Sequence, residues 1–234
     1  MEKNMKTVGI IGGLGPETTN KFCLEVINFC LKNNKNQRPP MLVWNVPMPV
    51  KVERDLITKN IGKEKFLPFL INAAKILEKA GADFLVIPCN TVHIFIDEIK
   101  SAVNIPVLSI IDETLSVIKD QRISHIGLLA TSTTINNNLF DDKLKFLGIE
   151  QITPSARDQS KLDKIIHNLV VGKGNIKDEG KVDRIISNIK RLGVKNIILA
   201  CTDLQLIVKN RPDVRILDTM QILAGATAEE ILRR

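Results

Sequence analysis

Two cysteines occupy matching positions in this sequence, each directly after an apolar stretch. The segment "FLVIPCNTVH" (84–93) places Cys89 at the end of such a run, and "NIILACTDLQ" (196–205) does the same for Cys201. A cysteine used only for packing would lie within the apolar run, whereas both of these thiols are followed by polar residues. Thiols ionise with an ordinary pKa of about 8.5, close enough to neutrality for acid/base work. Both positions are therefore candidates for proton transfer.

The segments around the two cysteines belong to a longer internal repeat. Three pairs of segments match in the same order. "LEKAGADFLVIPCNT" (from 77) matches "IKRLGVKNIILACTD" (from 189) at an offset of 112 residues, and "VGIIGGLGPETTNKF" (from 8) matches "IGLLATSTTINNNLF" (from 126) at 118. More loosely, "IPVLSIIDET" (from 105) matches "VRILDTMQIL" (from 214) at an offset of 109. Glycine helix ends and apolar strands are common in any βα unit. Three matches in one order nevertheless favour a duplication into halves of ordinary domain size.

The elements that carry these cysteines follow an alternating pattern. Short apolar, β-branched runs alternate with stretches that have apolar residues at helical spacing. The strands expected are 7–11, 41–45, 84–88, 107–110, 126–130, 150–153, 196–200 and 215–217. Fully apolar strands separated by helices indicate a parallel sheet covered on both faces. The predicted fold class is α/β.

We predict two similar Rossmann-like half-domains, each a parallel sheet flanked by helices. The first covers residues 1–116 and the second 117–217, while a C-terminal helix over 218–234 packs back on the first. A pseudo-two-fold axis would relate the halves, with the active site in the cleft between them.

This arrangement predicts a definite chemistry for the two thiols. Ligands of open parallel sheets bind at the carboxyl ends of the strands, where Cys89 and Cys201 are both expected. Each thiol would also begin a helix, whose free amides favour the thiolate and lower its pKa. If one thiol removes a proton from a carbon and the other delivers a proton to its opposite face, the stereocentre is inverted.

Composition and spacing argue against several other classes of protein. No apolar stretch is long enough to span a membrane, and the N-terminal apolar run enters a glycine turn without a cleavage site, which predicts a cytoplasmic protein. Four cysteines without a C-x-x-C pair indicate free thiols and no metal site. The net charge of +7 comes from scattered Lys and Arg, and with no Tyr the chain is poor material for stacking on bases. A mild preference for small anions is the better interpretation.

Residues beside the expected strand ends are candidates for holding a substrate. "GGLGPETT" (12–19) lacks the third glycine of a dinucleotide loop, and we interpret it as one wall of the site, with Gly13 and Leu14 nearest. Asn90, Thr91, Thr202 and Asp203 follow the two cysteines, where helix-start amides face a ligand. The same residue types are also good helix caps, and both roles can coexist. His93 is expected to support the first thiol or to cap the packing there.

The motifs "VGIIGGLGPETT", "IPCNTVH" and "LACTDLQL", in this order and spacing, resemble the aspartate/glutamate racemase family. The resemblance extends over essentially the whole chain. It implies a racemase that works without pyridoxal phosphate or another cofactor, with Cys89 and Cys201 as the two catalytic bases. It also implies a homodimer and a small anionic amino acid, aspartate or glutamate, as substrate. Asp203 departs from the family pattern, which usually has Glu at this position.

The resemblance further assigns Thr131, Ser132 and Thr133 of "ATSTT" to substrate binding. A simple turn at the start of a helix would use the same hydroxyls. Family members carry an Arg and a Lys in the loops that correspond here to 45–56 and 171–177. Arg54 and Lys173 are therefore candidates for the distal carboxylate of the substrate, with Lys51 as a further one, although surface charge is the default for each.

Three hypotheses follow from the sequence. The first is an amino-acid racemase. The second is a related isomerase of the same superfamily, resembling maleate isomerase or hydantoin racemase. The third is a non-catalytic protein that binds small anions, in which the thiols take no part. A protein that only binds needs no acid/base pair, so the matched cysteines favour an enzyme.

Overall fold

The structure is a computed structural model that describes residues 5–33, 37–119, 121–209 and 211–233. Its strands are β1 (Val8–Gly12), β2 (Met41–Asn45), β3 (Phe84–Val86), β4 (Val107–Leu108), β5 (His125–Ala130), β6 (Glu150–Ile152), β7 (Asn196–Ala200) and β8 (Arg215–Asp218). Its α-helices are α1 (Pro16–Asn33), α2 (Val50–Lys59), α3 (Lys63–Lys79), α4 (Ile96–Ser101), α5 (Ile110–Ile118), α6 (Ser132–Asn136), α7 (Asp141–Phe146), α8 (Ala156–Val170), α9 (Ile176–Lys190) and α10 (Thr219–Leu232). Two short 3₁₀ turns, η1 (Thr91–Phe95) and η2 (Thr202–Leu206), follow the two cysteines.

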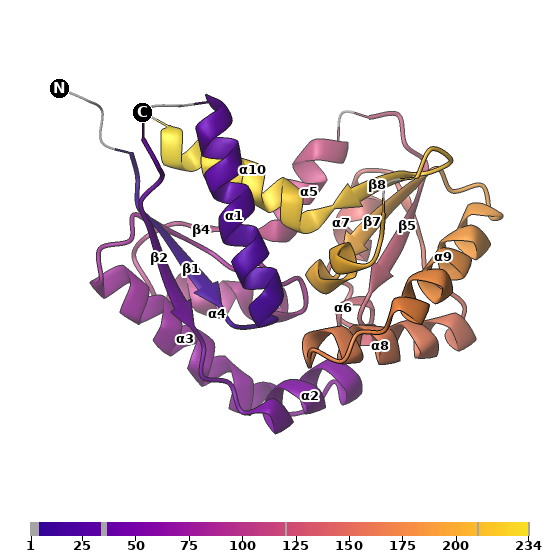
Figure 1. The fold of residues 1–234 in the computed structure, drawn as a ribbon, viewed down its shortest axis with the longest axis horizontal. Coiled ribbons are helices and arrows are strands. Elements are labelled where there is room, and N and C mark those ends of the chain that lie inside the picture. The colour runs from indigo at the N-terminus through magenta and orange to yellow at the C-terminus, as the bar shows by residue number, and fades with distance from the viewer. Residues whose placement is uncertain (1–4, 34–36, 120, 210, 234) are drawn as a thin grey trace.

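The strands form two parallel four-stranded sheets of the same topology. Their orders are β2-β1-β3-β4 and β6-β5-β7-β8, so each strand of the first sheet has a counterpart in the second. Figure 1 shows the two sheets side by side, each with helices packed on it. The predicted α/β class and the two similar halves are confirmed.

The strand registers confirm the internal repeat residue by residue. Gly9 of β1 lies opposite Leu85 of β3, and Gly127 of β5 lies opposite Ile197 of β7. A side chain at either glycine would meet the facing strand: a Cβ at Gly9 would lie 2.6 Å from Leu85 Cδ2, and one at Gly127 would lie 2.9 Å from Ile197 Cγ1. The same Cβ atoms would lie 3.2 Å from Leu77 of α3 and 3.0 Å from Ile189 of α9, so both halves use a glycine to admit a close approach of strand and helix.

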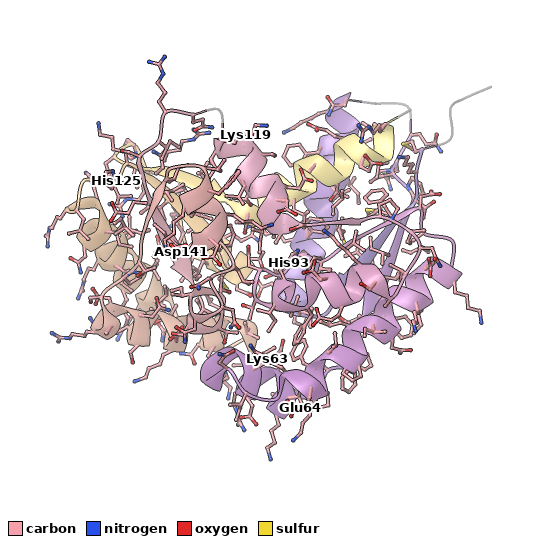
Figure 2. The ribbon with its side chains drawn as sticks, turned by 180° about the vertical axis from the view of Figure 1, so that it is seen from behind. Lys63, Glu64, His93, Lys119, His125 and Asp141 are labelled. Atoms are coloured by element: carbon pink, nitrogen blue, oxygen red, sulfur yellow. The ribbon has the colours of Figure 1, made fainter. Side chains whose placement is uncertain are left out.

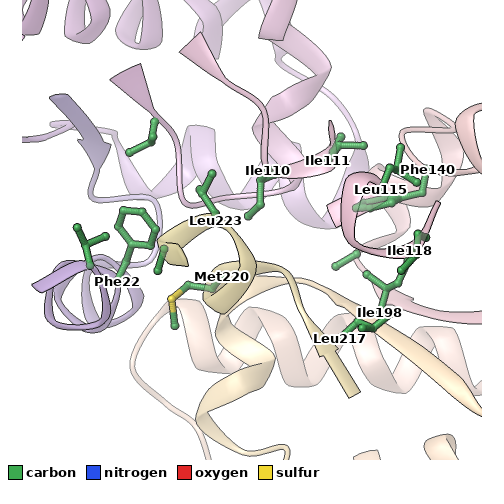
Figure 3. Packing of buried hydrophobic residues seen from close by; sticks show 14 of the residues in the cluster. Phe22, Ile110, Ile111, Leu115, Ile118, Phe140, Ile198, Leu217, Met220 and Leu223 are labelled. Atoms are coloured by element: carbon green, nitrogen blue, oxygen red, sulfur yellow. The ribbon is translucent and has the colours of Figure 1, made fainter. Parts of the chain in front are cut away.

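A single apolar core joins the two halves. Alternate residues of the central strands, such as Val8 and Ile10 of β1 and Ile126 and Leu128 of β5, face this core. Helices α1, α5 and α10 contribute most of the rest, and Figure 3 shows Phe22, Ile110 and Met220 converging there from different elements. The opposite faces of the two sheets have their own cores, under α3 and α4 in the first half and under α8 and α9 in the second. Burial of this shared core gives the halves a fixed relation.

The C-terminal helix α10 packs on the first half. It lies beside α1 in Figure 1, and the backbone N–H of Lys6 donates to the carbonyl of Ile231 over 3.0 Å. The Lys6 ammonium also pairs with Glu230. The expected boundary at residues 116 and 117 falls within α5, which packs against α10, and the division at that point stays a prediction.

The segment 45–56, expected as a loop, is in part a helix. Prolines 47 and 49 precede α2, and Pro49 occupies its N-cap. Proline suits the start of a helix because it has no N–H to satisfy, and the Glu, Arg and Leu residues that follow favour helix.

Helix α2 and the start of α3 also contact the second half. Thr133 Oγ1 donates to the carbonyl of Leu56 over 2.8 Å, and Lys63 Nζ donates to Asn137 Oδ1 over 2.7 Å. Figure 2 shows Lys63 where α3 begins, at the edge facing the other half. The α2 region therefore bridges the two halves.

The close approach at the repeated glycines predicts a stability effect. Gly9→Ala should lower the free energy of unfolding by about 1–3 kcal/mol, because the new methyl overlaps Leu85 and Ala82. Gly180→Ala is the matched control: this glycine lies inside α9 with open space around it, so alanine should raise the free energy of unfolding by up to about 1 kcal/mol. Urea unfolding followed by circular dichroism measures both. Equal stability of the two variants would contradict the packing described.

Candidate active site

A closed cavity lies at the carboxyl ends of the central strands, between the two halves. Both cysteines line it, together with Asn90, Thr91, Thr202 and Asp203 from the turns that follow them. The rest of its wall is Leu14, Glu53, Leu56, Phe66, Val92, Thr131, Ile166 and Val170. Its free volume is about 20 Å³, which is room for a single water molecule. In this conformation the side chains fill the space between the thiols.

The cavity gathers most of the residues that the sequence singles out. Eight of them line it: Leu14, Cys89, Asn90, Thr91, Thr131, Cys201, Thr202 and Asp203. Five do not: Gly13, Arg54, Ser132, Thr133 and Lys173. The sequence analysis missed Glu53 and the apolar wall, which come mainly from helices whose inward faces only the tertiary structure defines. The role of each residue in binding stays a prediction.

A histidine holds the backbone at the first cysteine, and its support of the thiol stays a prediction. His93 Nδ1 lies 2.8 Å from the carbonyl of Cys89, and the N–H of Ile110 donates to His93 Nε2 over 3.1 Å. These partners fix the ring as the neutral tautomer with its proton on Nδ1. Burial lowers the pKa of His93 to about 4, which agrees with that state. His93, labelled in Figure 2, thus joins the cysteine turn to the start of α5.

The second thiol lies beside a buried carboxyl group. Cys201 Sγ is 3.9 Å from Asp203 Oδ2, within reach of a weak S–H hydrogen bond. Thr18 Oγ1 donates to the other oxygen of Asp203 over 2.7 Å. Gly15 leaves the space that this carboxyl occupies, because a Cβ there would lie 2.9 Å from Asp203 Oδ1. Gly15 and Thr18 of the first half therefore position the Asp203 carboxyl group of the second half.

Hydroxyl groups connect the halves across the site. Thr91 Oγ1 lies 3.0 Å from Thr131 Oγ1 and 3.2 Å from Thr134 Oγ1, and the last two are 3.0 Å apart. Thr131 also caps α6 by accepting from the N–H of Thr134. The adjacent Ser132 donates instead to Asp163, away from the cavity. Of the "ATSTT" hydroxyls, only Thr131 thus has a direct place in the cavity wall.

The predicted lowering of the cysteine pKa values is wrong for this closed cavity. Burial raises the pKa of Cys89 to about 12, outweighing the N–H groups of Val92 and Thr91 that favour the thiolate. Burial also raises the pKa of Cys201 well above its ordinary value, and the Asp203 charge adds to the effect. The sequence indicates the helpful amides, whereas the burial of the sulfur atoms is a property of the packing.

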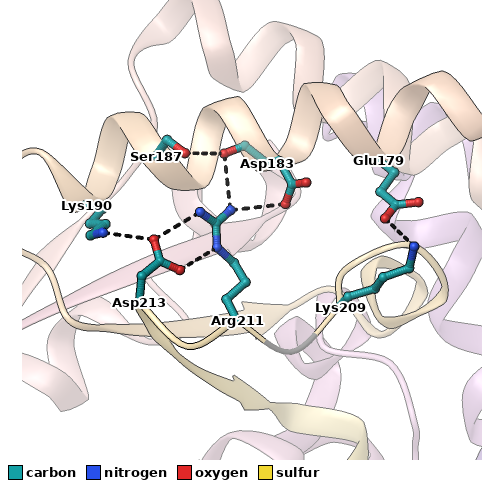
Figure 4. A network of polar contacts seen from close by, with 7 residues as sticks. All are labelled: Glu179, Asp183, Ser187, Lys190, Lys209, Arg211 and Asp213. Atoms are coloured by element: carbon teal, nitrogen blue, oxygen red, sulfur yellow. Dashed lines mark hydrogen bonds and ion pairs between the residues drawn. The ribbon is translucent and has the colours of Figure 1, made fainter.

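The charge inside the cavity is acidic, although the whole chain is basic. Of the described residues that line it, Glu53 and Asp203 are the charged ones, and none is Lys or Arg. Many cations are paired on the surface, as Figure 4 shows for Arg211, which contacts Asp183 and Asp213 over 3.1 and 3.0 Å. The scattered Lys and Arg residues therefore say little about the ligand.

Among the described residues, no cluster of His, Cys, Asp or Glu is suited to hold a metal ion. Within the same part of the chain, no helix combines the length and apolarity needed to cross a membrane.

Comparison with known proteins decides the family. The family model described as Asp/Glu/Hydantoin racemase matches residues 11–227. The chain belongs to this racemase family. The predicted resemblance is confirmed, as is the class of enzyme, an isomerase acting on amino acids.

Relatives of this racemase family match over nearly the full chain. The broad specificity amino-acid racemase RacX of Bacillus subtilis (strain 168) is 28% identical over 96% of this chain and 98% of its own length. Among solved structures, an aspartate racemase homologue from Pyrococcus horikoshii OT3 is 29% identical, with a TM-score of 0.78 over 98% of this chain and 100% of that one. The aspartate racemase of Picrophilus torridus is 26% identical, with a TM-score of 0.82 over 98% of this chain and 95% of that one.

The buried carboxyl group beside Cys201 predicts a pH-dependent stability. Burial raises the pKa of Asp203 to about 6, while an unfolded aspartate titrates near about 3.9. The carboxyl group of Asp203 therefore holds its proton more tightly in the folded protein than in the unfolded chain. As a result, the free energy of unfolding falls as the pH rises from about 4 to about 6. Asp203→Asn removes this loss and should raise the free energy of unfolding at pH 7 by at most about 3 kcal/mol.

Urea unfolding at pH 4 and pH 7 measures the effect. The gain from Asp203→Asn should vanish at pH 4, where the native carboxyl is also neutral. Glu64→Gln, at an exposed position of α3, is the control and should show no such gain. A gain of the same size at both pH values would contradict the buried, raised-pKa state of Asp203.

Proposed function

We propose that this protein is a cofactor-independent amino-acid racemase that uses Cys89 and Cys201 as a pair of bases on opposite faces of the substrate. One observation carries the proposal: the two thiols hold equivalent places in the two repeats, and both line one closed cavity. Membership of the racemase family supports the same reaction.

The proton moves as follows when Cys201 acts first. Asp203 accepts the thiol proton, which leaves a thiolate 3.9 Å away. The thiolate then takes the Cα proton of the amino acid, and the C–H electron pair delocalises into the α-carboxylate. The Cys89 thiol donates its proton to the opposite face of the carbon, giving the other enantiomer. Turnover in the reverse direction exchanges the roles of the two sulfur atoms.

The buried surroundings of the thiols bear on this reaction. The α-proton of an amino acid is a very weak acid, so its removal needs a strong base that is still ionised often enough near the working pH. Burial raises the pKa of both thiols, so that a thiolate once formed is a strong base. The same burial strengthens every electrostatic contact with the developing carbanion.

Hydroxyl and amide groups around the sulfur atoms are suited to hold the substrate backbone. Thr91 and Thr131 line the cavity with hydroxyl groups that could donate to an α-carboxylate, and Thr202 lines it while donating to the carbonyl of Pro88. Asn90 lines it too, with its side-chain oxygen unpaired. Leu14 supplies an apolar contact from the glycine loop. These assignments extend the sequence prediction to the residues that reach the cavity.

The side chain of the substrate is less constrained by these groups. The resemblance favours aspartate or glutamate, and relatives named aspartate racemase agree with that prediction. Arg54 and Lys173 would then hold the distal carboxylate, but neither lines the cavity. Homodimer formation and a cytoplasmic location likewise stay predictions of the sequence.

A related isomerase reaction, of the maleate isomerase or hydantoin racemase type, would use the same pair of thiols. A protein that only binds small anions fits the site less well, because carboxyl groups and thiols surround the cavity and no described cation faces it.

Replacing either thiol tests the two-base mechanism. Cys89→Ala and Cys201→Ala should each lower the rate of racemisation by roughly 10²–10⁴-fold, because one face of the carbon loses its acid or base. The rate is measured by optical rotation and by uptake of deuterium at Cα in D₂O, with a panel of L-amino acids and no pyridoxal phosphate.

Cys23→Ala is the control, since Cys23 lies on α1 outside the cavity and its loss should leave the rate unchanged. Full racemisation by either active-site variant would rule out the paired mechanism. If the unaltered protein neither racemises nor exchanges any amino acid, the proposed function itself is wrong.

A further inference from the structure

The charges that line the cavity bear on which amino acid it takes. Glu53 and Asp203 face it, and no Lys or Arg is among its described lining residues. Arg54, next to Glu53 in α2, is about half exposed, and its Nε lies 3.9 Å from Asp55 Oδ1. Lys173 is exposed in the segment between α8 and α9. An acidic substrate would therefore bring a second carboxylate into a cavity that already holds two acidic side chains.

The two carboxyl groups differ in what they contact. Asp203 accepts a hydrogen bond from Thr18 and lies next to the Cys201 thiol, so both of its oxygens have partners. The carboxyl group of Glu53 makes no hydrogen bond or ion pair with another described residue, and its backbone N–H donates to the carbonyl of Pro49. Burial and the nearby Asp203 raise the pKa of Glu53 to about 7, as expected for a carboxyl group that has no cation beside it. Glu53 is therefore the acid with free capacity for a ligand.

A second buried group in the cavity is a hydrogen-bond acceptor without a donor. Asn90 is 1% exposed and lines the cavity, and its Oδ1 has no partner among the described residues. Its amide orientation is fixed, because the Thr219 hydroxyl donates to the carbonyl of Leu199 and can only accept from Asn90 Nδ2. A buried acceptor without a partner is costly, and an ammonium group would satisfy it. Asn90 thus suits the α-ammonium and leaves Glu53 for another cation.

Much of the remaining lining is apolar. Leu56 lies one turn after Glu53 on the same face of α2, and Phe66 and Val92 adjoin it in the lining. Ile166 and Val170, one turn apart on α8, complete the apolar part. Such a surface suits a chain of methylene groups.

We propose that this cavity selects an amino acid whose side chain is an aliphatic stem ending in a cation, the class of lysine and ornithine, and that Glu53 pairs with the distal cation. The inference rests on the proposed racemase function and gives it a substrate class. It differs from the acidic substrates that the sequence favours. The apolar wall contacts the stem, Glu53 sets the preference for charge, and Asn90 holds the amino group next to the reacting carbon.

The test compares substrates that differ at one point. L-Lysine, L-norleucine, L-aspartate and L-glutamate are supplied in D₂O, and kcat/KM for deuterium uptake at Cα is measured for each. Norleucine ends the carbon chain where lysine carries its ammonium, so their ratio isolates the distal charge. The native protein should favour lysine over norleucine by about ten-fold or more, and over aspartate by a larger factor.

Glu53→Gln should bring the ratio of lysine to norleucine close to one, because the glutamine amide has no charge to pair with the distal ammonium. Glu64→Gln, an exposed position on α3, is the matched control and should leave the ratio unchanged. A native preference for aspartate or glutamate, or an unchanged ratio in Glu53→Gln, would overturn the proposed substrate class.

Binding separates this proposal from the proposed function. Calorimetry with the double variant Cys89→Ala, Cys201→Ala measures L-lysine binding in the absence of proton transfer. Lysine binding that depends on Glu53, with no exchange by the native protein, supports the cationic subsite and contradicts the racemase. Exchange of aspartate without exchange of lysine supports the racemase and contradicts the subsite.

Discussion

Ionisable side chains are buried between the two sheets, and the rest of the structure has to compensate for the water they lose. Removing a carboxyl group or a thiol from water disfavours its charged form, which is why the pKa values of Cys89, Cys201 and Asp203 are all raised. Polar groups placed there need partners with good geometry. Thr18 supplies one to Asp203, and the shared apolar core keeps both sheets in the relation that those contacts require. If the region between the two sheets were loosely packed, water would enter it, and both the hydrogen bonds and the raised pKa values would be lost.

The repeat provides the thiols as a matched pair, while differences between its copies give them unlike surroundings. Asn90 follows the first cysteine and is anchored to Thr219 at the start of α10, whereas Asp203 follows the second and is anchored to Thr18 of α1. Thr202 adds a third hydrogen bond between the two halves by donating to the carbonyl of Pro88. The residues that would touch the substrate therefore also fix the position of one half relative to the other.

Much of this could be predicted from the sequence because it depends on local patterns. The apolar runs defined all the strands to within a residue or two, and the spacing of Gly9, Gly127 and the two cysteines revealed the repeat. The helical character of α2 was missed because prolines on either side of Met48 resemble a loop, and with it the inward face that carries Glu53. The direction of the cysteine pKa shifts was also missed, because it depends on how completely distant helices exclude water from the sulfur atoms.

Helix α2 carries part of the cavity wall and also one of the contacts between the two halves. The Leu56 side chain lines the cavity, and its backbone carbonyl accepts the hydrogen bond from Thr133 of the other half. A cavity with room for one water molecule must widen before an amino acid can occupy it, and a movement of α2 that displaces Leu56 also strains this bond. Admission of a ligand would therefore disturb one contact between the two halves, while the shared apolar core keeps them in place. While this bond is in place, the side chains around the thiols leave little room for water, which would protect a carbanion from stray protons.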